Sequence, residues 1–158
     1  MPNPDQFYIT KDGYKDYLTV RVYKTQKAMY EASEKLGALY KNESNGDKDS
    51  TAWFITTPVN KCKFTNSEFT ADMYGIILLN EEYLLYDLIA HECLHAALAH
   101  ERLINRYMLD YYNENGEEER LAWHMQYIFA NILDALKEYG YKVRQTTKKD
   151  AKNAREAV

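Results

Sequence analysis

The sequence has few cysteines and no long apolar run. Only two of its 158 residues are cysteine, Cys62 and Cys93, and they do not form a C-x-x-C motif. Two thiols cannot build a disulfide framework or a four-thiolate zinc site, so a reducing compartment is the simplest expectation. The longest purely apolar runs, such as 76–79 and 88–90, fall far short of the roughly 18 residues that a membrane span needs. We therefore expect no membrane association.

Excess positive charge, a leader and linkers are also missing. The chain has 20 Lys and Arg against 24 Asp and Glu, a net charge of -4, which argues against a general nucleic-acid binder because such proteins neutralise phosphates. The opening segment MPNPDQFYITKDGY has neither a basic leader nor an apolar core, which predicts a cytoplasmic protein. Without repeats or Pro- or Ser-rich linkers, we expect one domain over 1–141 and a polar, basic tail over 142–158 that frays. No pattern indicates an oligomeric state.

The apolar periodicity predicts a small mixed or antiparallel sheet packed with three helices, an α+β fold. Alternating apolar residues predict a strand at 18–23. Three further strands are expected at 51–57, 62–65 and 74–79. Helices are expected at 26–39, 81–112 and 117–139. Thr25 and Asn80 are suited to cap the first two helices, and Gly140 stands where a glycine commonly ends a helix.

The most informative motif is H-E-x-x-H at 91–95. On a helix, His91 and His95 lie about 40° apart, so their imidazoles converge on one point. Glu92 lies about 60° from His95, close enough to take a proton from a water without binding the metal itself. Zn²⁺ lowers the pKa of a water that it binds to about 7, and a neighbouring carboxylate can deprotonate that water as it attacks a carbonyl. We expect Cys93 and Leu94 to point toward the core.

A hydrolytic zinc site needs a third protein ligand. The longer H-E-x-x-H-x-x-G-x-x-H pattern fails, because Leu98 replaces its glycine and Glu101 its last histidine. His100 is excluded because it lies about 180° from His91 on a continuous helix. The remaining candidates stand at the start of the third predicted helix: Glu117, Glu118, Glu119 and His124. On periodicity alone, Glu118 lies closer than Glu119 to the centre of that helix's apolar stripe.

The run HECLH, followed 24 residues later by the run ERLA that begins at Glu119, resembles the gluzincins. It is most similar to the compact ImmA/IrrE-like and phage-type metallopeptidases, in which a short mixed sheet precedes the H-E-x-x-H helix. The resemblance covers roughly 74–136. It implies that Glu119 binds zinc, that Ala122 packs where the helices cross, and that Met125 and Phe129 fill the core behind. Relatives often have Asn or Asp after that alanine, where this chain has Trp123.

These patterns together predict a zinc-dependent metallopeptidase acting on a peptide or protein substrate that the sequence does not identify. His91, His95 and Glu119 are the expected zinc ligands, and Glu92 is the expected catalytic residue. The strand at 74–79 is expected to be the sheet edge to which an extended peptide adds. The alternative is a zincin-like regulatory or interaction protein without turnover, in which His124 or Cys62 closes the metal shell.

Overall fold

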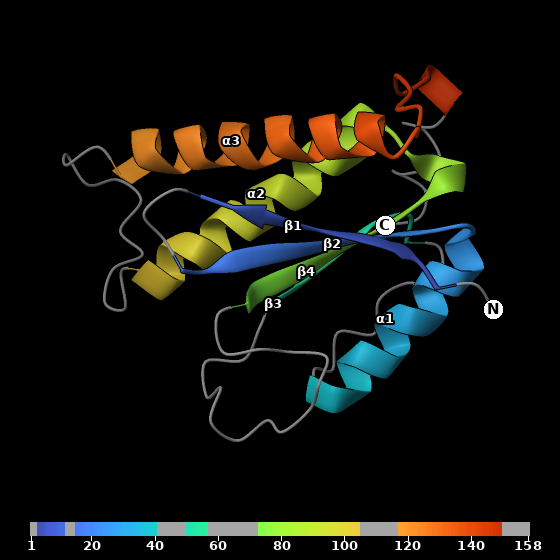
Figure 1. The fold of residues 1–158 in the computed structure, drawn as a ribbon, viewed down its shortest axis with the longest axis horizontal. Helices are drawn as coiled ribbons and strands as arrows, with labels where there is room; N and C mark the ends of the chain where they lie inside the picture. The colour runs from blue at the N-terminus through green and yellow to red at the C-terminus, as the bar shows by residue number, and fades with distance from the viewer. Residues whose placement is uncertain (1–2, 12–14, 41–49, 57–72, 105–116, 150–158) are drawn as a thin grey trace.

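The computed structural model of the protein describes residues 3–11, 15–40, 50–56, 73–104 and 117–149. The fold is α+β, as expected, with four strands and three α-helices in these residues (Figure 1). In chain order the elements are β1 (Asp5–Thr10), β2 (Tyr17–Tyr23), α1 (Gln26–Tyr40), β3 (Trp53–Thr56), β4 (Met73–Asn80), the 3₁₀ turn η2 (Glu81–Tyr83), α2 (Tyr86–Ile104) and α3 (Glu117–Glu138). The sequence did not predict β1, and the strand expected at 62–65 lies outside the described residues.

The sheet is mixed, with strand order β1-β2-β4-β3. β1 is antiparallel to β2, β2 is parallel to β4, and β3 is antiparallel to β4. The expectation that 74–79 forms a sheet edge is therefore wrong, because β4 lies between β2 and β3. Among the described strands, β3 stands at that end of the sheet. All eight β4 residues are buried, and a strand that is apolar on both sides is one that is covered on both faces.

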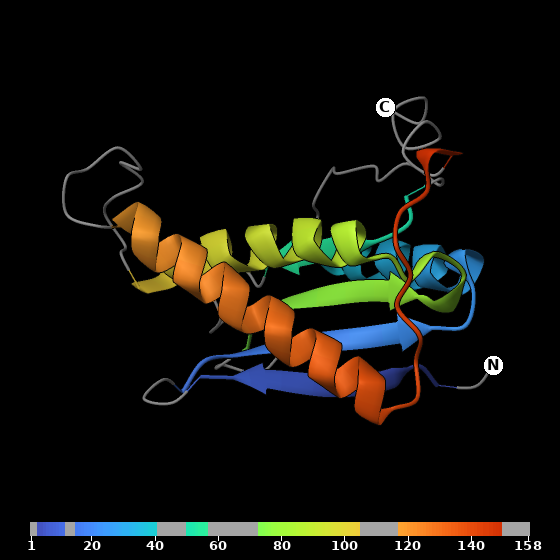
Figure 2. The ribbon, with the colours of Figure 1, turned by 90° about the horizontal axis from the view of Figure 1, so that it is seen from above.

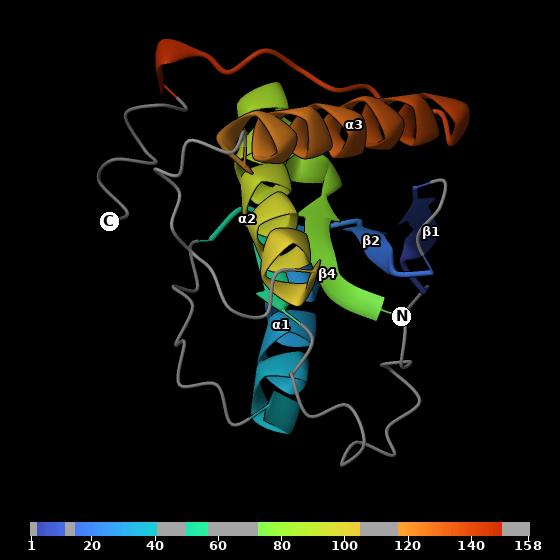
Figure 3. The ribbon, with the colours of Figure 1, turned by 90° about the vertical axis from the view of Figure 1, so that its left-hand side faces the viewer.

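Helices cover both faces of the sheet. Figures 1 and 3 show α2 and α3 on one face and α1 on the other, and Figure 2 shows α3 crossing obliquely over α2 toward β1. Successive β4 side chains alternate between the two layers. Ile77 and Leu79 pack with Ile89 and Cys93 of α2, whereas Ile76 and Leu78 pack in the second cluster, which includes residues of α1. Within the described residues, no helix is long and apolar enough to span a bilayer.

Asn80 is fully buried at the end of β4 and joins three segments of the chain. Its side-chain oxygen accepts a hydrogen bond from the backbone N–H of Tyr83 (3.1 Å), so the expected capping role is confirmed. The capped element is η2, however, and α2 begins only at Tyr86. The Asn80 amide nitrogen donates to the carbonyl of Thr51 (2.9 Å) and to the sulfur of Met29 (3.6 Å). This one side chain thereby links η2 to α1 and to the segment before β3.

The end of α3 is set by Gly140, as the sequence predicted. Gly140 has a φ of 85°, a conformation that costs glycine little. Its N–H donates to the carbonyl of Lys137 (3.0 Å), and the next N–H, of Tyr141, donates to the carbonyl of Leu136 (2.9 Å). These are the paired bonds of a Schellman motif, which satisfies carbonyls that a helix end otherwise leaves open.

The segment after α3 is attached to the beginning of α2. The N–H of Arg144 donates to the carbonyl of Leu84 (2.9 Å), and the carbonyl of Arg144 accepts from the N–H of Tyr86 (3.0 Å). The hydroxyl of Thr146 donates to the carboxylate of Asp87. The expected fraying of the tail is thus wrong for 142–146, because these residues satisfy the first free N–H of α2. Residues 150–158 lie outside the described part.

Tyrosine hydroxyls tie edge strand β1 to α3 and to the segment that follows. Tyr127 donates to the carbonyl of Thr10 (2.6 Å), and Tyr139 donates to the carbonyl of Gln6 (3.1 Å). Tyr141 donates to the carboxylate of Asp5. Edge strands expose backbone groups that invite pairing with other chains, and side chains that occupy or cover those groups reduce that tendency.

Candidate metal centre

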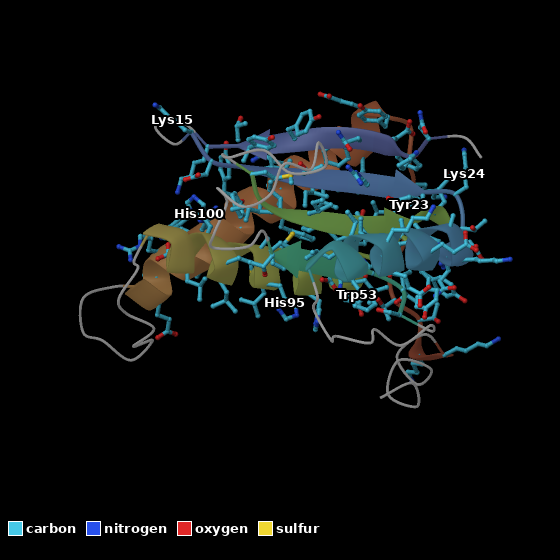
Figure 4. The ribbon with its side chains drawn as sticks, turned by 90° about the horizontal axis from the view of Figure 1, so that it is seen from below. Lys15, Tyr23, Lys24, Trp53, His95 and His100 are labelled. Atoms are coloured by element: carbon cyan, nitrogen blue, oxygen red, sulfur yellow. The ribbon has the colours of Figure 1, made fainter. Side chains whose placement is uncertain are left out.

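Two histidines of α2 lie on its exposed side, away from the core. His91 and His95 are exposed, whereas Cys93 is fully buried, as the helical spacing predicted. Figure 4 shows His95 and His100 on different sides of this helix. Leu94 was expected in the core but is 41% exposed, because it lies about 100° from Cys93 and outside the buried arc of the helix.

Small residues of α2, rather than Ala122 of α3, are buried in the layer that the two helices share. Ala96 and Ala97 are fully buried and pack in one cluster with Ile128 and Ile132 of α3. Ala122 is exposed, contrary to what the resemblance implied. Met125 and Phe129, which were expected to fill the core, are partly buried against this cluster. The buried face of α2 therefore points toward α3 and the sheet, and the two exposed histidines lie outside it.

The imidazoles of His91 and His95 converge. Their Nε2 atoms are hydrogen-bonded to each other at 3.2 Å, with ring centroids 4.9 Å apart and ring planes at 69°. A tetrahedral zinc ion bound to two imidazole nitrogens at about 2.0–2.1 Å would hold those nitrogens about 3.3 Å apart. The spacing of the two nitrogens fits two adjacent positions in such a ligand shell.

Glu92 lies on the flank of the histidine face and is 6% exposed. Burial disfavours the charged form of a carboxyl group, and it raises the pKa of Glu92 from 4.5 to about 7. A group with a pKa near the working pH can both accept and release a proton. Glu92 follows His91 on α2, but its side chain is buried whereas both imidazoles are exposed.

The predicted third ligand, Glu119, is not brought to the histidine pair. Glu118 and Glu119 are both exposed, and the described residues contain no group of three His, Cys, Asp or Glu side chains placed to hold a metal. The first turn of α3 lies instead by the far end of α2, where Arg120 pairs with Glu101 at 3.0 Å. Glu101 is six residues, or about 9 Å along the helix, beyond His95.

The two candidate carboxylates lie on different faces of α3. Glu118 shares its face with Leu121 and Met125, which are partly buried against the core. Glu119 shares its face with Trp123, which is 60% exposed. The side chain of Glu117 lies outside the described part of the structure.

His124, the remaining candidate ligand, belongs to a separate buried cluster. It is 3% exposed, and its ring lies 4.2 Å from that of His100, which also contacts the ring of Tyr74 at 4.8 Å. Burial, followed by the charges of His100 and Lys11, lowers the pKa of His124 to about 3. Burial also lowers the pKa of His100, against the opposing influence of Asp16 and Glu101. The helical spacing of the apolar residues in α2 and α3 already places each of these two histidines on the buried side of its helix.

The contribution of His124 to stability should fall as the pH drops below about 6.5. A histidine with a lowered pKa stays neutral in the folded protein, whereas the unfolded chain gains its proton near pH 6.5. At pH 5, His124 alone should therefore remove about 2 kcal/mol from the free energy of unfolding. Urea unfolding at pH 7.5 and pH 5 should show that His124→Gln gains about 2 kcal/mol relative to the wild type at the lower pH. The two proteins are compared at each pH because burial raises the pKa of Glu92, which acts in the opposite direction in both. An equal pH dependence of the two proteins would contradict this prediction.

The site therefore offers two convergent imidazoles and a buried carboxyl group on one helix turn. Comparisons with protein-family models, with curated proteins and with solved structures found no match to this chain. The chemistry of the site must accordingly be argued from its own residues. Two neutral imidazole nitrogens are good ligands for a divalent transition metal, and a carboxyl group with a pKa near 7 is suited to proton transfer.

Proposed function

We propose that the chain is a zinc-dependent peptidase of the gluzincin type, in which His91 and His95 bind zinc and Glu92 is the general base. The observation that carries this proposal is the convergence of the two imidazoles: their Nε2 atoms are hydrogen-bonded at 3.2 Å, a separation close to that of adjacent ligands on zinc. The exposure of both imidazoles leaves room for a substrate. We also propose a cytoplasmic location, which is compatible with the free thiol of Cys93.

In the proposed reaction, Glu92 moves the proton. A zinc ion held by His91 and His95 would supply Lewis acidity to activate water and polarise the peptide carbonyl. A carboxylate oxygen of Glu92 accepts the proton from the attacking water and then delivers it to the nitrogen of the departing amine. Burial raises the pKa of Glu92 to about 7, and the charge of a nearby zinc ion would favour the carboxylate form that accepts the proton.

Edge strand β3 is the proposed support for the substrate. It replaces 74–79 in this role, since β4 is an inner strand. The ring of Phe54, on β3, is parallel to that of His95 on α2, so the edge strand borders the histidine pair. An extended peptide that adds to β3 by backbone hydrogen bonds would run past the two imidazoles.

The third ligand is proposed to be a carboxylate from the first turn of α3. The resemblance to the gluzincins favours Glu119, whereas the packed face of α3 favours Glu118. Either assignment requires the first turn of α3 to approach the histidine pair when the metal binds. Glu118→Gln and Glu119→Gln form a matched pair, because each removes one negative charge at adjacent exposed positions.

Zinc titration of metal-free protein tests the proposal. We expect about one zinc per chain by equilibrium dialysis and hydrolysis of quenched fluorescent casein by the loaded protein. His91→Ala and His95→Ala should each weaken zinc binding at least about tenfold, since each removes a ligand. One of Glu118→Gln and Glu119→Gln should also weaken it, and Glu138→Gln, at the other end of α3, should not. Absence of zinc uptake, or uptake unchanged in His91→Ala, would refute the metal site.

A metal-dependent interaction protein without turnover is the second candidate. Leu94 and Trp123 favour it, because these large apolar side chains are 41% and 60% exposed. Exposed apolar side chains can take part in contacts with a protein partner. Stoichiometric zinc binding together with no cleavage of casein or of a random peptide mixture would favour this alternative.

A further inference from the structure

The ring of Phe54 lies parallel to the imidazole of His95. The two ring planes differ by 1°, and the centroids are 6.5 Å apart. Phe54 stands on edge strand β3 and is partly buried against the core, whereas His95 stands on the exposed face of α2. An anchored ring from the sheet therefore borders an exposed ring on the helix.

Gly75 of β4 determines where the Phe54 ring can lie. In the β3–β4 register, Phe54 pairs with Ile77, and Gly75 is its diagonal neighbour. A Cβ atom added at Gly75 would lie 2.3 Å and 2.5 Å from two carbons of the Phe54 ring and 3.0 Å from the carbonyl oxygen of Ile55. The Phe54 ring thus rests directly on bare backbone, in space that any other residue at position 75 would fill.

We propose that Phe54, seated on Gly75, is a positioning residue that orients the imidazole of His95. An exposed histidine can rotate about its two side-chain torsions, and a neighbouring parallel ring restricts that rotation. In the observed orientation, Nε2 of His95 is hydrogen-bonded to Nε2 of His91 at 3.2 Å, and the Phe54 ring borders the same imidazole. Metal-binding histidines are commonly oriented by hydrogen bonds to their other ring nitrogen, and here a flat apolar surface contributes to the same task.

The proposal has a consequence for the metal, and that part rests on the proposed function. Ligands that are held in the binding geometry lose less conformational freedom when the metal binds, and so bind it more tightly. Removing the Phe54 ring should therefore lower zinc affinity without removing any ligand atom. The orientation of His95 can be measured without metal, which separates the two claims.

The first experiment measures the His95 ring in the metal-free protein. Phe54→Leu removes the aromatic ring but keeps apolar volume, and it should change the ring-proton NMR shifts of His95 more than those of His100 and His124. Phe54→Tyr keeps a ring and should restore shifts close to the wild-type values. Trp53→Leu is the matched control, because Trp53 is also an aromatic residue on β3 but packs in the other cluster, on the α1 side of the sheet. It should leave the His95 shifts unchanged.

The second experiment titrates the same four proteins with zinc chloride in competition with a chelating dye. Phe54→Leu should weaken zinc binding about tenfold, the lower end of the effect of residues that orient metal ligands. Phe54→Tyr and Trp53→Leu should bind zinc as the wild type does. Gly75→Ala, which displaces the ring rather than deleting it, should weaken binding in the same direction, provided that its urea unfolding shows a folded protein.

The two experiments fail separately. Unchanged His95 shifts in Phe54→Leu would overturn the positioning role, whatever the zinc result. Changed shifts with unchanged zinc affinity would show that the orientation of His95 does not matter for the metal, and would overturn that consequence. A wild-type protein that takes up no zinc would refute the proposed function, while the NMR comparison still decides whether Phe54 orients His95.

Discussion

Glu92→Gln should lower the rate of peptide hydrolysis by at least about a hundredfold, the smallest effect typical of losing a general base. Glutamine has nearly the shape of glutamate but cannot accept a proton from the attacking water. Zinc affinity should stay close to the wild-type value, because His91 and His95 are untouched. Equilibrium dialysis and the casein assay on the same preparation would measure both quantities.

The same substitution should make the metal-free protein more stable. Burial raises the pKa of Glu92 from 4.5 to about 7, a shift that corresponds to about 3 kcal/mol. The ionised side chain is therefore unfavourable in the fold above pH 7, and glutamine removes this penalty. Working out the sign, the gain should be absent below about pH 4.5, grow between pH 4.5 and 7, and stay level above. Urea unfolding in the presence of EDTA at pH 4 and pH 8 would measure it.

Glu138→Gln is the control for that comparison, because Glu138 is exposed and its replacement should not change stability. An inactive but more stable Glu92→Gln variant would indicate a residue retained for chemistry at the expense of stability. A variant that hydrolyses casein at the wild-type rate would remove Glu92 from the mechanism. A variant that is less stable at pH 8 would show that the carboxylate is favourably paired in the fold.

Asn80→Asp should destabilise the fold by about 3–5 kcal/mol. The aspartate side chain cannot donate the two hydrogen bonds that the Asn80 amide gives to Thr51 and Met29. The carbonyl of Thr51 would lose its partner, and a fully buried group would have to carry a charge or take up a proton. Such a loss is a large part of the total stability of a typical domain. Urea unfolding at pH 7 would measure the difference from the wild type.

Asn131→Asp is the matched control for Asn80→Asp. The Asn131 side chain is half-buried on α3 and donates to the carbonyl of Tyr127, one turn earlier in the same helix (2.8 Å). Losing a bond within one helix should cost less than about 1 kcal/mol. Equal destabilisation by the two variants would mean that the contacts of Asn80 between separate segments contribute little.

The elements that the sequence predicted well are those whose signals lie within a few consecutive residues. β2 was found from its alternating apolar residues, although it is an inner strand that is buried on both faces rather than half-buried. The Thr25 hydroxyl caps α1 by accepting from the N–H of Ala28 (3.1 Å), and Gly140 ends α3. β1 was missed although Phe7 and Ile9 are buried and alternate with exposed residues. Its position depends on pairing with β2, a contact that the local pattern of six residues does not reveal.

The candidate site likewise has one part that the local sequence predicts and another that depends on the whole fold. The convergence of His91 and His95 follows from the arithmetic of one helix turn and needs no knowledge of the rest of the chain. The third ligand depends on how α3 crosses α2, and the crossing is set by packing between the two helices. The position of Phe54 beside His95 depends on the strand order and on the space above Gly75. Neither is encoded in residues that are neighbours in the sequence.

The tyrosine contacts along β1 limit how many chains one sheet can recruit. A sheet with two open edges can add a strand on each side, so that association can continue into long assemblies. Here Tyr127, Tyr139 and Tyr141 occupy polar groups of β1. Among the described strands, β3 then offers the more open side of the sheet for one added strand. A single strand that pairs with β3 leaves no second open side for another molecule. The fold can therefore use strand addition for recognition with less risk of polymerisation.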